Sequence, residues 1–541
     1  MPALPLRHLS IRVPWHDAAW DGTVCHDPKG NASCLVLKEI RDSRDDEQEQ
    51  RLAGQSIATL DQETQWPACV GERMTFMAPF EFTRTVKHPY AGFSPDHVHI
   101  TPATFLHPAY SAAVIPFRWM SRKDAWELAS RLDLDVDPER DPTDGWLEWN
   151  NWVQDHANQR VLLDTFFSAV EPERSLCFFY AKQTPMLDDA DRILVGAGRV
   201  RAVGPLVEYG YSAPGKYRSY VWDRAVEHSV RPTFDDGFLL PYHELLERAK
   251  EGESIDLPAC TALCPEDRRT EFSYAGEHVT HDGAIAALLR CRDALEHSEP
   301  YVTTPTGLMF KWIDARLGEL WRLRGPTPGL GAALVAFGVE RGNLLAYELS
   351  SVLGENESPW VLLDGLMAGT HHVSDRADAL LTRTTRDKWL AISAKKPERR
   401  ALLELVARFE LTDDQAKRLW VIENRKEAGI DASDADLLAN PYLLFERDRV
   451  SPDPVSAWTI DRGAFPAPTI RELHPLPEPS NVGDPTDRRR VRALVIETLE
   501  QAGSEGHTLQ PRDSVVSKVR RYALVVGPVS CCPHAVSTLP V

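Results

Sequence analysis

The sequence has no apolar run long enough to cross a bilayer, and its first ten residues, Met1–Ser10, have no apolar segment of signal-peptide type. We therefore expect a cytoplasmic protein that does not bind membranes. The sequence also has no excess of positive charge, because 61 lysines and arginines face 80 aspartates and glutamates, for a formal net charge of −19. This balance excludes a protein surface that is positively charged throughout and binds nucleic acid, but it is compatible with a local cluster of basic residues.

A complete nucleotide-binding loop is missing as well. The segment Gly210-Tyr-Ser-Ala-Pro-Gly-Lys-Tyr217 has the glycine and lysine spacing of a P-loop, but a tyrosine stands where a small hydroxyl would bind Mg²⁺. Pro214 also removes one of the N–H donors that such a loop uses. Trp360–Asp364 is only superficially similar to the acidic strand end that accompanies a P-loop, and we interpret it as a core strand. No Ser/His/Asp or Cys/His set stands out, so the catalytic residues, if any, stay unknown.

The 541 residues, 43% of them hydrophobic, suffice for three or four domains. Short β-rich runs at Ser175–Tyr180 and Ile193–Val200 indicate strands, whereas 220–250 and 283–295 have helical spacing. The break at Gly325–Gly329 precedes a mostly helical half. We predict an α+β fold in five parts: a mixed N-terminal domain (1–160), a β-rich barrel-like domain with flanking helices (161–325), a helical domain (326–450), a proline-rich linker over the surface (451–486), and a helical unit with an irregular tail (487–541).

Two short helices are predicted within Arg399–Glu446. The apolar face of the first is made by Leu402, Leu403, Leu405 and Val406. Thr412 or Asp413 is a suitable N-cap for the second, which carries Ala416, Leu419 and Trp420. Two short helices joined by a tight turn can present backbone N–H groups to a DNA phosphate.

These helices, the Asn440-Pro-Tyr-Leu443 segment, and the run Asp487–Glu500 with Gly506-His-Thr-Leu-Gln-Pro-Arg512 after it resemble the helix-hairpin-helix region of bacterial RecD-like superfamily 1 DNA helicases. The resemblance covers roughly residues 395–520, and in that family this region immediately precedes the ATPase core. Glu410 and the segment Ser456–Gly463 depart from the family's glycine-rich turns.

The resemblance implies a nucleic-acid-binding accessory region, in DNA repair or phage defence, whose partners are single-stranded or forked DNA and a helicase motor. It also implies that the chain is truncated before that motor. ATP and Mg²⁺ would then be bound only by the full-length parent, and this chain would not hydrolyse ATP by itself.

Basic side chains are the candidates for contact with the phosphate backbone, since each can neutralise a phosphate and make binding depend on salt. They form two clusters, one before each helical module: Lys395, Lys396, Arg399 and Arg400, and then Arg488, Arg489, Arg490 and Arg492. The alternative is that these residues only make a solvated helix surface.

Aromatic residues near the β-rich runs suggest a second mode of binding. The strand Cys177–Tyr180 and the glycine-rich Val195–Val200 are similar to small PUA-like and EVE-like barrels, in which a pocket holds a flipped base. The candidate pocket residues are Phe178, Tyr180, Tyr209, Tyr211 and Trp222. The alternative is an ordinary aromatic core strand.

Cysteine is sparse and odd in number, with nine residues, which in a reducing compartment favours thiols or metal ligands over disulfides. Cys25, Cys34 and Cys69 with His16 or His26 have ligand types that suit zinc, although their spacing is not compact. A second candidate set is Cys260, Cys264, His278 and His281. Buried thiols and surface imidazoles are the alternative for both sets.

Two other functions stay open from the sequence. An independent nuclease or metal-dependent hydrolase site could lie within residues 1–310, where His16, Asp17 and Asp21 make a potential acid–base cluster. The chain could also be a structural adaptor without a ligand.

Overall fold

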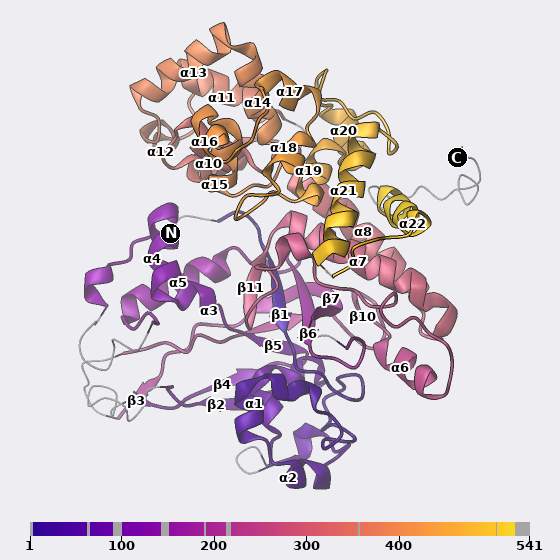
Figure 1. Cartoon of the computed structure of the whole chain (residues 1–541). Helices are drawn as coiled ribbons and strands as arrows, with labels where there is room; N and C mark the ends of the chain where they lie inside the picture. The colour runs from indigo at the N-terminus through magenta and orange to yellow at the C-terminus, as the bar shows by residue number, and fades with distance from the viewer. Residues whose placement is uncertain are drawn as a thin grey trace. The chain divides into compact units, whose positions relative to one another are not determined.

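The computed structural model describes residues 4–61, 65–89, 100–141, 151–188, 191–212, 218–354, 357–504 and 506–524 (Figure 1). The chain divides into two compact units, Met1–Ala315 and Arg316–Val541. The first unit mixes strands and helices, and the second is helical. The predicted α+β class with a helical C-terminal half is therefore confirmed.

A seven-stranded sheet, curled into a half-barrel, forms the centre of the first unit, in the order β11-β1-β6-β7-β9-β5 with β10 also paired to β7. Neighbouring strands are antiparallel except β1 and β6, which are parallel. Two-stranded sheets join β2 to β4 and β3 to β8. The strands are β1 (His8–Arg12), β2 (Phe82–Val86), β3 (Ile100–Thr101), β4 (Ala103–His107), β5 (Ser111–Val114), β6 (Leu176–Lys182), β7 (Arg192–Val203), β8 (Gly210–Tyr211), β9 (Arg224–His228), β10 (Gly237–Leu239) and β11 (Gly276–Val279).

The sequence of the central strands explains their position. All residues of β6 except Lys182 are buried, as expected for a continuous apolar run covered on both faces. On β7, Gly196 and Gly198 face β10, and a side chain at Gly196 would come within 3.1 Å of the Leu239 Cα. Glycine therefore permits the close approach of β10. The helical spacing of 220–250 predicted too much helix, because β9 and β10 occupy its first half.

Helix α7 lies against the sheet, in contact with β7 and β11 (Figure 1). Its buried face includes Ile285 and Leu288, and Thr280 caps its N-terminus by accepting the Gly283 N–H. The helices of this unit are α1 (Lys38–Ser43), α2 (Asp46–Arg51), α3 (Phe117–Met120), α4 (Arg122–Leu132), α5 (His156–Ser168), α6 (Tyr242–Lys250), α7 (His281–Ser298) and α8 (Thr306–Arg324), which continues into the second unit.

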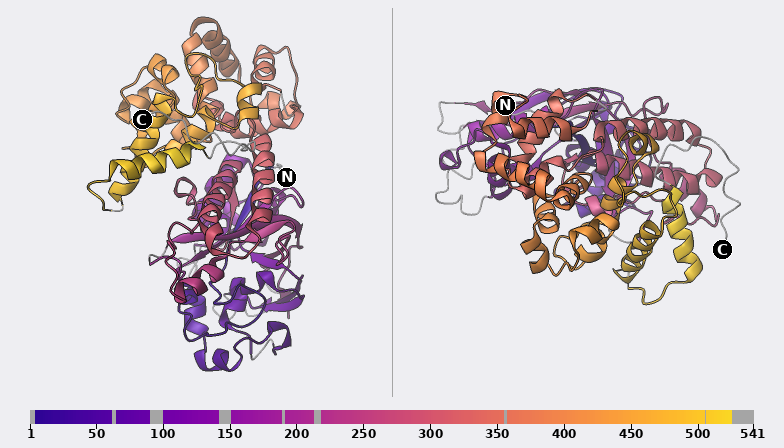
Figure 2. Two further views of the ribbon diagram at one scale, coloured as in Figure 1. Left: turned by 90° about the vertical axis from the view of Figure 1, so that its right-hand side faces the viewer. Right: turned by 90° about the horizontal axis from the view of Figure 1, so that it is seen from above.

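The second unit packs its helices around one large apolar core, which includes Leu345, Leu402 and Leu419. Leu494, Val515 and Val519 form a smaller core between α21 and α22, which lie side by side (Figure 2). Its helices are α9 (Leu330–Phe337), α10 (Gly342–Val352), α11 (Pro359–Ala368), α12 (Asp375–Ala379), α13 (Arg383–Lys395), α14 (Pro397–Val406), α15 (Asp413–Trp420), α16 (Ile422–Glu427), α17 (Asp434–Ala439), α18 (Leu443–Asp448), α19 (Ala457–Ala464), α20 (Pro468–Leu473), α21 (Arg488–Ser504) and α22 (Arg512–Leu524).

The proline-rich segment 451–486 is more regular than the sequence suggested. It contains α19 and α20, and residues 457 and 459–467 are buried. The prolines stand largely at helix starts and between helices, where a missing N–H costs little. This segment is therefore part of the helical core and does not merely wrap over the surface. The predicted irregular tail, 525–541, lies outside the described residues.

Among the residues that the structure describes, no helix is both long enough and apolar enough to cross a membrane.

Candidate nucleic-acid interface

The first basic cluster lies where α13 ends and α14 begins. Arg399 pairs with Asp434 at 3.1 Å and lies over the Trp420 ring. Arg400 pairs with Asp364 at 2.9 Å and with Glu404 at 2.7 Å. Lys395 and Lys396 are exposed, and in the described part of the chain no hydrogen bond or ion pair holds either ammonium group. Within the described residues, the two lysines are therefore the members of this first cluster that offer uncompensated charge to a ligand.

In the second basic cluster, at the start of α21, some arginines are also buried or paired and others are exposed. Arg490 is fully buried and donates two hydrogen bonds to Asp461, at 2.7 and 2.8 Å. Arg489 bonds to Asp487 and to the Ala439 carbonyl oxygen, which it reaches at 2.9 Å.

Two further arginines of this cluster are exposed. Arg492 pairs with Glu446 at 2.8 Å. Within the described ranges, the exposed guanidinium of Arg488 has no acidic partner.

Arg490 was predicted to contact phosphate, but its side chain is buried. A guanidinium that is completely shielded from water and held by a carboxylate cannot reach a phosphate from outside in this structure. Such a pair orders the core, because removing either partner leaves an uncompensated buried charge. The sequence did not distinguish the buried Arg490 from Arg488, Arg489 and Arg492. All four have the same side chain, and they differ only in the side of the helix on which they lie.

The predicted hairpin turns do not present backbone N–H groups to solvent. Ala407, Arg408 and Phe409, in the turn between α14 and α15, are all buried. Their N–H groups already donate within the turn, to the carbonyl oxygens of Leu403, Leu405 and Val406 at 3.1, 3.0 and 3.1 Å. The segment Ser456–Gly463, proposed as the second hairpin, forms the N-cap and body of α19. In these two segments, side chains are therefore the remaining groups for phosphate contact.

The five aromatic residues of the predicted base pocket lie in three separate places. Phe178 and Tyr180 are fully buried in β6, and the Tyr180 hydroxyl donates to the Tyr274 carbonyl at 2.6 Å. Tyr209 and Tyr211 belong to a small core beside β3 and β8. Trp222 packs against other aromatic rings, those of Phe117 and Trp152. Phe178 and Tyr180 are therefore core residues of the sheet, whereas Tyr211 and Trp222 are only partly buried.

One potential metal-ligand group occurs in the described ranges. His16, Asp17 and Cys25 each offer one ligand atom, and these atoms lie within 4.8 Å of one another. However, His16 Nδ1 accepts the Ala18 N–H at 2.9 Å, and its Nε2 lies 3.0 Å from the Thr23 carbonyl oxygen. Since a carbonyl can only accept, Nε2 carries the hydrogen, and the ring has no lone pair left for zinc.

The sulfur atoms near this group also have other partners. Burial raises the pKa of Cys25 to about 12, so it stays a thiol at neutral pH, and Asn31 donates to it at 3.3 Å. Cys34 accepts from Arg44 at 3.2 Å, and Cys69 lies 2.9 Å from the Met74 sulfur. These contacts are those of a packed turn, so the residues present do not fit a zinc ion in this conformation.

The second candidate zinc set is not assembled either. His278 stacks on Phe166 and bonds to its carbonyl oxygen at 2.9 Å, whereas His281 faces His8 at 3.0 Å. Cys260 and Cys264 are buried free thiols, and within the described residues they join no group of three ligands.

Two other sequence candidates can be placed. Asp21 accepts from the Thr23 backbone and hydroxyl, as in a capped turn, and Asp17 Oδ1 lies 3.7 Å from His16 Nδ1. Trp360–Asp364 is helical and not a strand, since it belongs to α11. The end of the P-loop-like segment, residues 213–217, lies outside the described residues.

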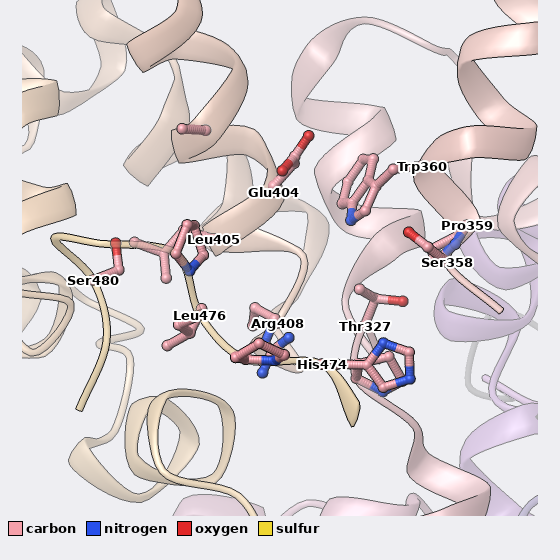
Figure 3. A pocket seen from close by; sticks show the side chains of 14 residues that line it. Thr327, Ser358, Pro359, Trp360, Glu404, Leu405, Arg408, His474, Leu476 and Ser480 are labelled. Carbon is pink, nitrogen blue, oxygen red and sulfur yellow. The ribbon is translucent and has the colours of Figure 1, made fainter. Parts of the chain in front are cut away.

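A cavity of about 150 Å³ in the second unit was not predicted from the sequence (Figure 3). It lies between the start of α11, the end of α14 and the segment after α20. Its polar lining includes Thr327, Ser358, Glu404, Arg408 and His474. These residues are far apart in the sequence, so no local motif points to them.

Comparison with known proteins gives no relative from which a role could be inferred. No family model, no curated protein and no solved structure matches this chain.

Proposed function

We propose that the chain is the nucleic-acid-binding, non-motor region of a RecD-like DNA helicase. The observation that carries this proposal is the exposure of Lys395, Lys396 and Arg488, whose charges meet no acidic partner within the described residues. They lie in the same helical unit as the Gly506–Arg512 segment that resembles the helicase family.

The physical basis is electrostatic. Each cation that contacts a phosphate releases condensed counterions, so a few unpaired side chains are enough to give measurable, salt-dependent affinity on an acidic protein. Residues that already hold a carboxylate, such as Arg399 and Arg400, contribute less, because DNA would have to displace that carboxylate.

The narrower structural assignments belong to the same proposal. Short helices such as α14 and α15 support a helix-hairpin-helix-like unit that positions DNA and a motor. The curled sheet of the first unit supports a PUA- or EVE-like barrel in outline only. The partners that we propose are single-stranded or forked DNA and, in a longer parent protein, the ATPase core.

The test is the binding of fluorescent single-stranded and forked oligonucleotides to the full chain, measured by anisotropy over a range of salt concentrations. The triple variant K395A/K396A/R488A should bind more weakly, and its log–log salt slope should be smaller by roughly 0.7–0.9 for each lost phosphate contact.

A matched control removes three exposed lysines of the first unit, K38A/K123A/K250A, and so changes the net charge equally. It should bind almost as the wild type does. Equal weakening by both triple variants, or no binding by the wild type at low salt, would contradict the proposal.

A further inference from the structure

Arg408 is unusual among the charged residues of the second unit. Its side chain lines the cavity and is only 8% exposed. No ion pair or side-chain hydrogen bond holds this guanidinium within the described residues, and its Nε atom is buried without a partner. Burial, together with the charge of Arg324, lowers its pKa to about 10, so it remains charged at neutral pH. A buried, unpaired cation is costly unless an anion accompanies it.

The nearest acidic group in the cavity wall does not fill this role. Glu404 lines the cavity, but its carboxylate accepts from Arg400 Nε at 2.7 Å. No ion pair within 4.0 Å joins it to Arg408 among the described residues. The charge of Arg324 contributes to the lowered pKa of Arg408, and the Arg324 guanidinium donates to the Arg408 carbonyl at 3.2 Å.

The cavity also offers donors of the kind that bind oxyanions. Helix α11 begins here with Ser358 as its N-cap, and the Ser358 side chain makes no capping hydrogen bond. Pro359, the first residue of α11, has no N–H, so the donors of this turn are the N–H groups of Trp360 and Val361, which no side-chain cap satisfies. The helix dipole favours a negative charge at this end. Thr327 and His474 contribute a hydroxyl and an imidazole to the lining.

The backbone that carries Arg408 is held from three sides. Gly329 donates to the Ala407 carbonyl at 3.0 Å, and Arg324 donates to the Arg408 carbonyl at 3.2 Å. On α19, Gly463 approaches so closely that a side chain there would come within 2.6 Å of the Arg408 carbonyl oxygen. The guanidinium is thus presented by a fixed turn, as a preorganised site requires.

We propose that this cavity binds a phosphate group, with Arg408 as its counterion and the first turn of α11 as its source of N–H donors. The guanidinium fork matches two phosphate oxygens. The volume of about 150 Å³ is well below that of typical sites for drug-sized ligands, roughly 300–1,000 Å³, so it suits the phosphate and not a whole nucleotide. This site does not depend on the exposed lysines or on the helicase proposal.

The experiment is titration of the full chain with inorganic phosphate at constant ionic strength, followed by calorimetry and by thermal unfolding. The wild type should bind phosphate and unfold at a higher temperature in its presence. The variant R408M should weaken phosphate binding roughly tenfold or more, because a charge-assisted pair is lost. Without phosphate, R408M should be at least as stable as the wild type, since it no longer buries an unpaired charge.

The control K426M removes an exposed charge from the same unit and should leave phosphate binding unchanged. A second variant, R408K, keeps the charge without the planar fork and should bind phosphate with intermediate affinity. Failure of the wild type to bind phosphate, or an undiminished response in R408M, would overturn the proposal.

A second arm distinguishes the source of the phosphate. It compares an oligonucleotide carrying a 5′-phosphate with the same strand lacking it. A preference for the phosphorylated strand that R408M loses supports this site and identifies a strand end as its ligand. Equal binding of both strands, together with Arg408-dependent binding of inorganic phosphate, supports a small free phosphate compound.

Discussion

The four arginines at the start of α21 are close together in the sequence, but their burial and their partners differ. Arg488 is exposed, Arg489 bonds to Asp487, Arg490 is buried against Asp461, and Arg492 reaches Glu446. Their chemistry is the same, so burial and the nearest carboxylate set their roles. Of these four, and as far as the described part of the chain shows, only Arg488 could bind a phosphate without breaking an ion pair.

Burial acts in the same way on a carboxyl group of the first unit. Glu277, on β11, is 4% exposed, and its Oε1 atom is buried without a partner. This burial raises the pKa of Glu277 to about 8, although nearby Arg118 opposes the shift. The group is therefore mostly protonated at neutral pH in the folded protein and ionised in the unfolded chain.

This difference makes stability depend on pH. The folded protein binds the additional proton between the ordinary carboxyl pKa of 4.5 and about 8. Across that window Glu277 lowers the free energy of unfolding as pH rises, by up to about 1.4 kcal/mol per pH unit. E277Q should remove this loss and be more stable than the wild type near pH 8, with little difference near pH 4. Urea unfolding of both proteins at pH 4 and at pH 8 measures this difference in the free energy of unfolding.

The exposed Glu251 provides the control for this prediction, and E251Q should have little effect at either pH. An E277Q protein that gains no stability at alkaline pH relative to its acid value would refute the assignment of Glu277 as a buried acid.

At the scale of elements, side-chain capping fixes where several helices of the second unit begin, α15 among them. Thr412 caps α15 by accepting the Gln415 N–H, and the Gln415 side chain accepts the Thr412 N–H in return. This reciprocal pair satisfies two backbone donors in a helix of only eight residues. The same helix presents Ala416, Leu419 and Trp420 to the core, as the sequence pattern predicted.

The substitution T412A should lower the local stability of α15 by about 1 kcal/mol, because a cap bond is lost. Native-state hydrogen exchange of the α15 amides measures this change. Thr384, exposed inside α13, is the matched control, and T384A should be neutral or slightly stabilising. Equal effects of the two substitutions would show that the cap does not stabilise α15.

At the scale of the molecule, the two units differ in their response to acid. The first unit buries several histidines in neutral form: the pKa values of His107, His228 and His278 are lowered to about 3, chiefly by burial. His8 and His16 are also lowered by burial. In the second unit, a lowered histidine pKa is found among the described residues only for His474.

An unfolded chain protonates these histidines below about pH 6.5, whereas the folded first unit does not. Each of them therefore lowers stability as pH falls from that value, by up to about 1.4 kcal/mol per pH unit. Burial raises the pKa of Glu49 as well as that of Glu277, and the several histidines outweigh the opposite effect of these two carboxyl groups. As pH falls, the amides of the first unit should lose their protection from hydrogen exchange at a higher pH than the amides of the second unit.

Hydrogen exchange of the full chain, read by mass spectrometry and corrected for the intrinsic effect of pH, follows both units together. Earlier loss of protection in the second unit, or simultaneous loss in both, would contradict the expected order.

The sequence alone determined the α+β class, the helical second half and the apolar face of α15, because these follow from local periodicity. It narrowed the cap of α15 to Thr412 or Asp413, and the structure shows that the cap is Thr412. It did not determine β9 and β10, since short strands within 220–250 exist only through pairing with β7. Nor did it show that 451–486 would be buried.

Only the tertiary structure decided which charges are free. Lys395 and Lys396 differ from Arg399 because they lie on the exposed side of the α13–α14 junction. Arg408 and the start of α11 line the same cavity only because helices that are distant in the sequence pack together. Pairing and burial are long-range properties, because a carboxylate that neutralises an arginine, or a helix that shields it, can come from any part of the chain.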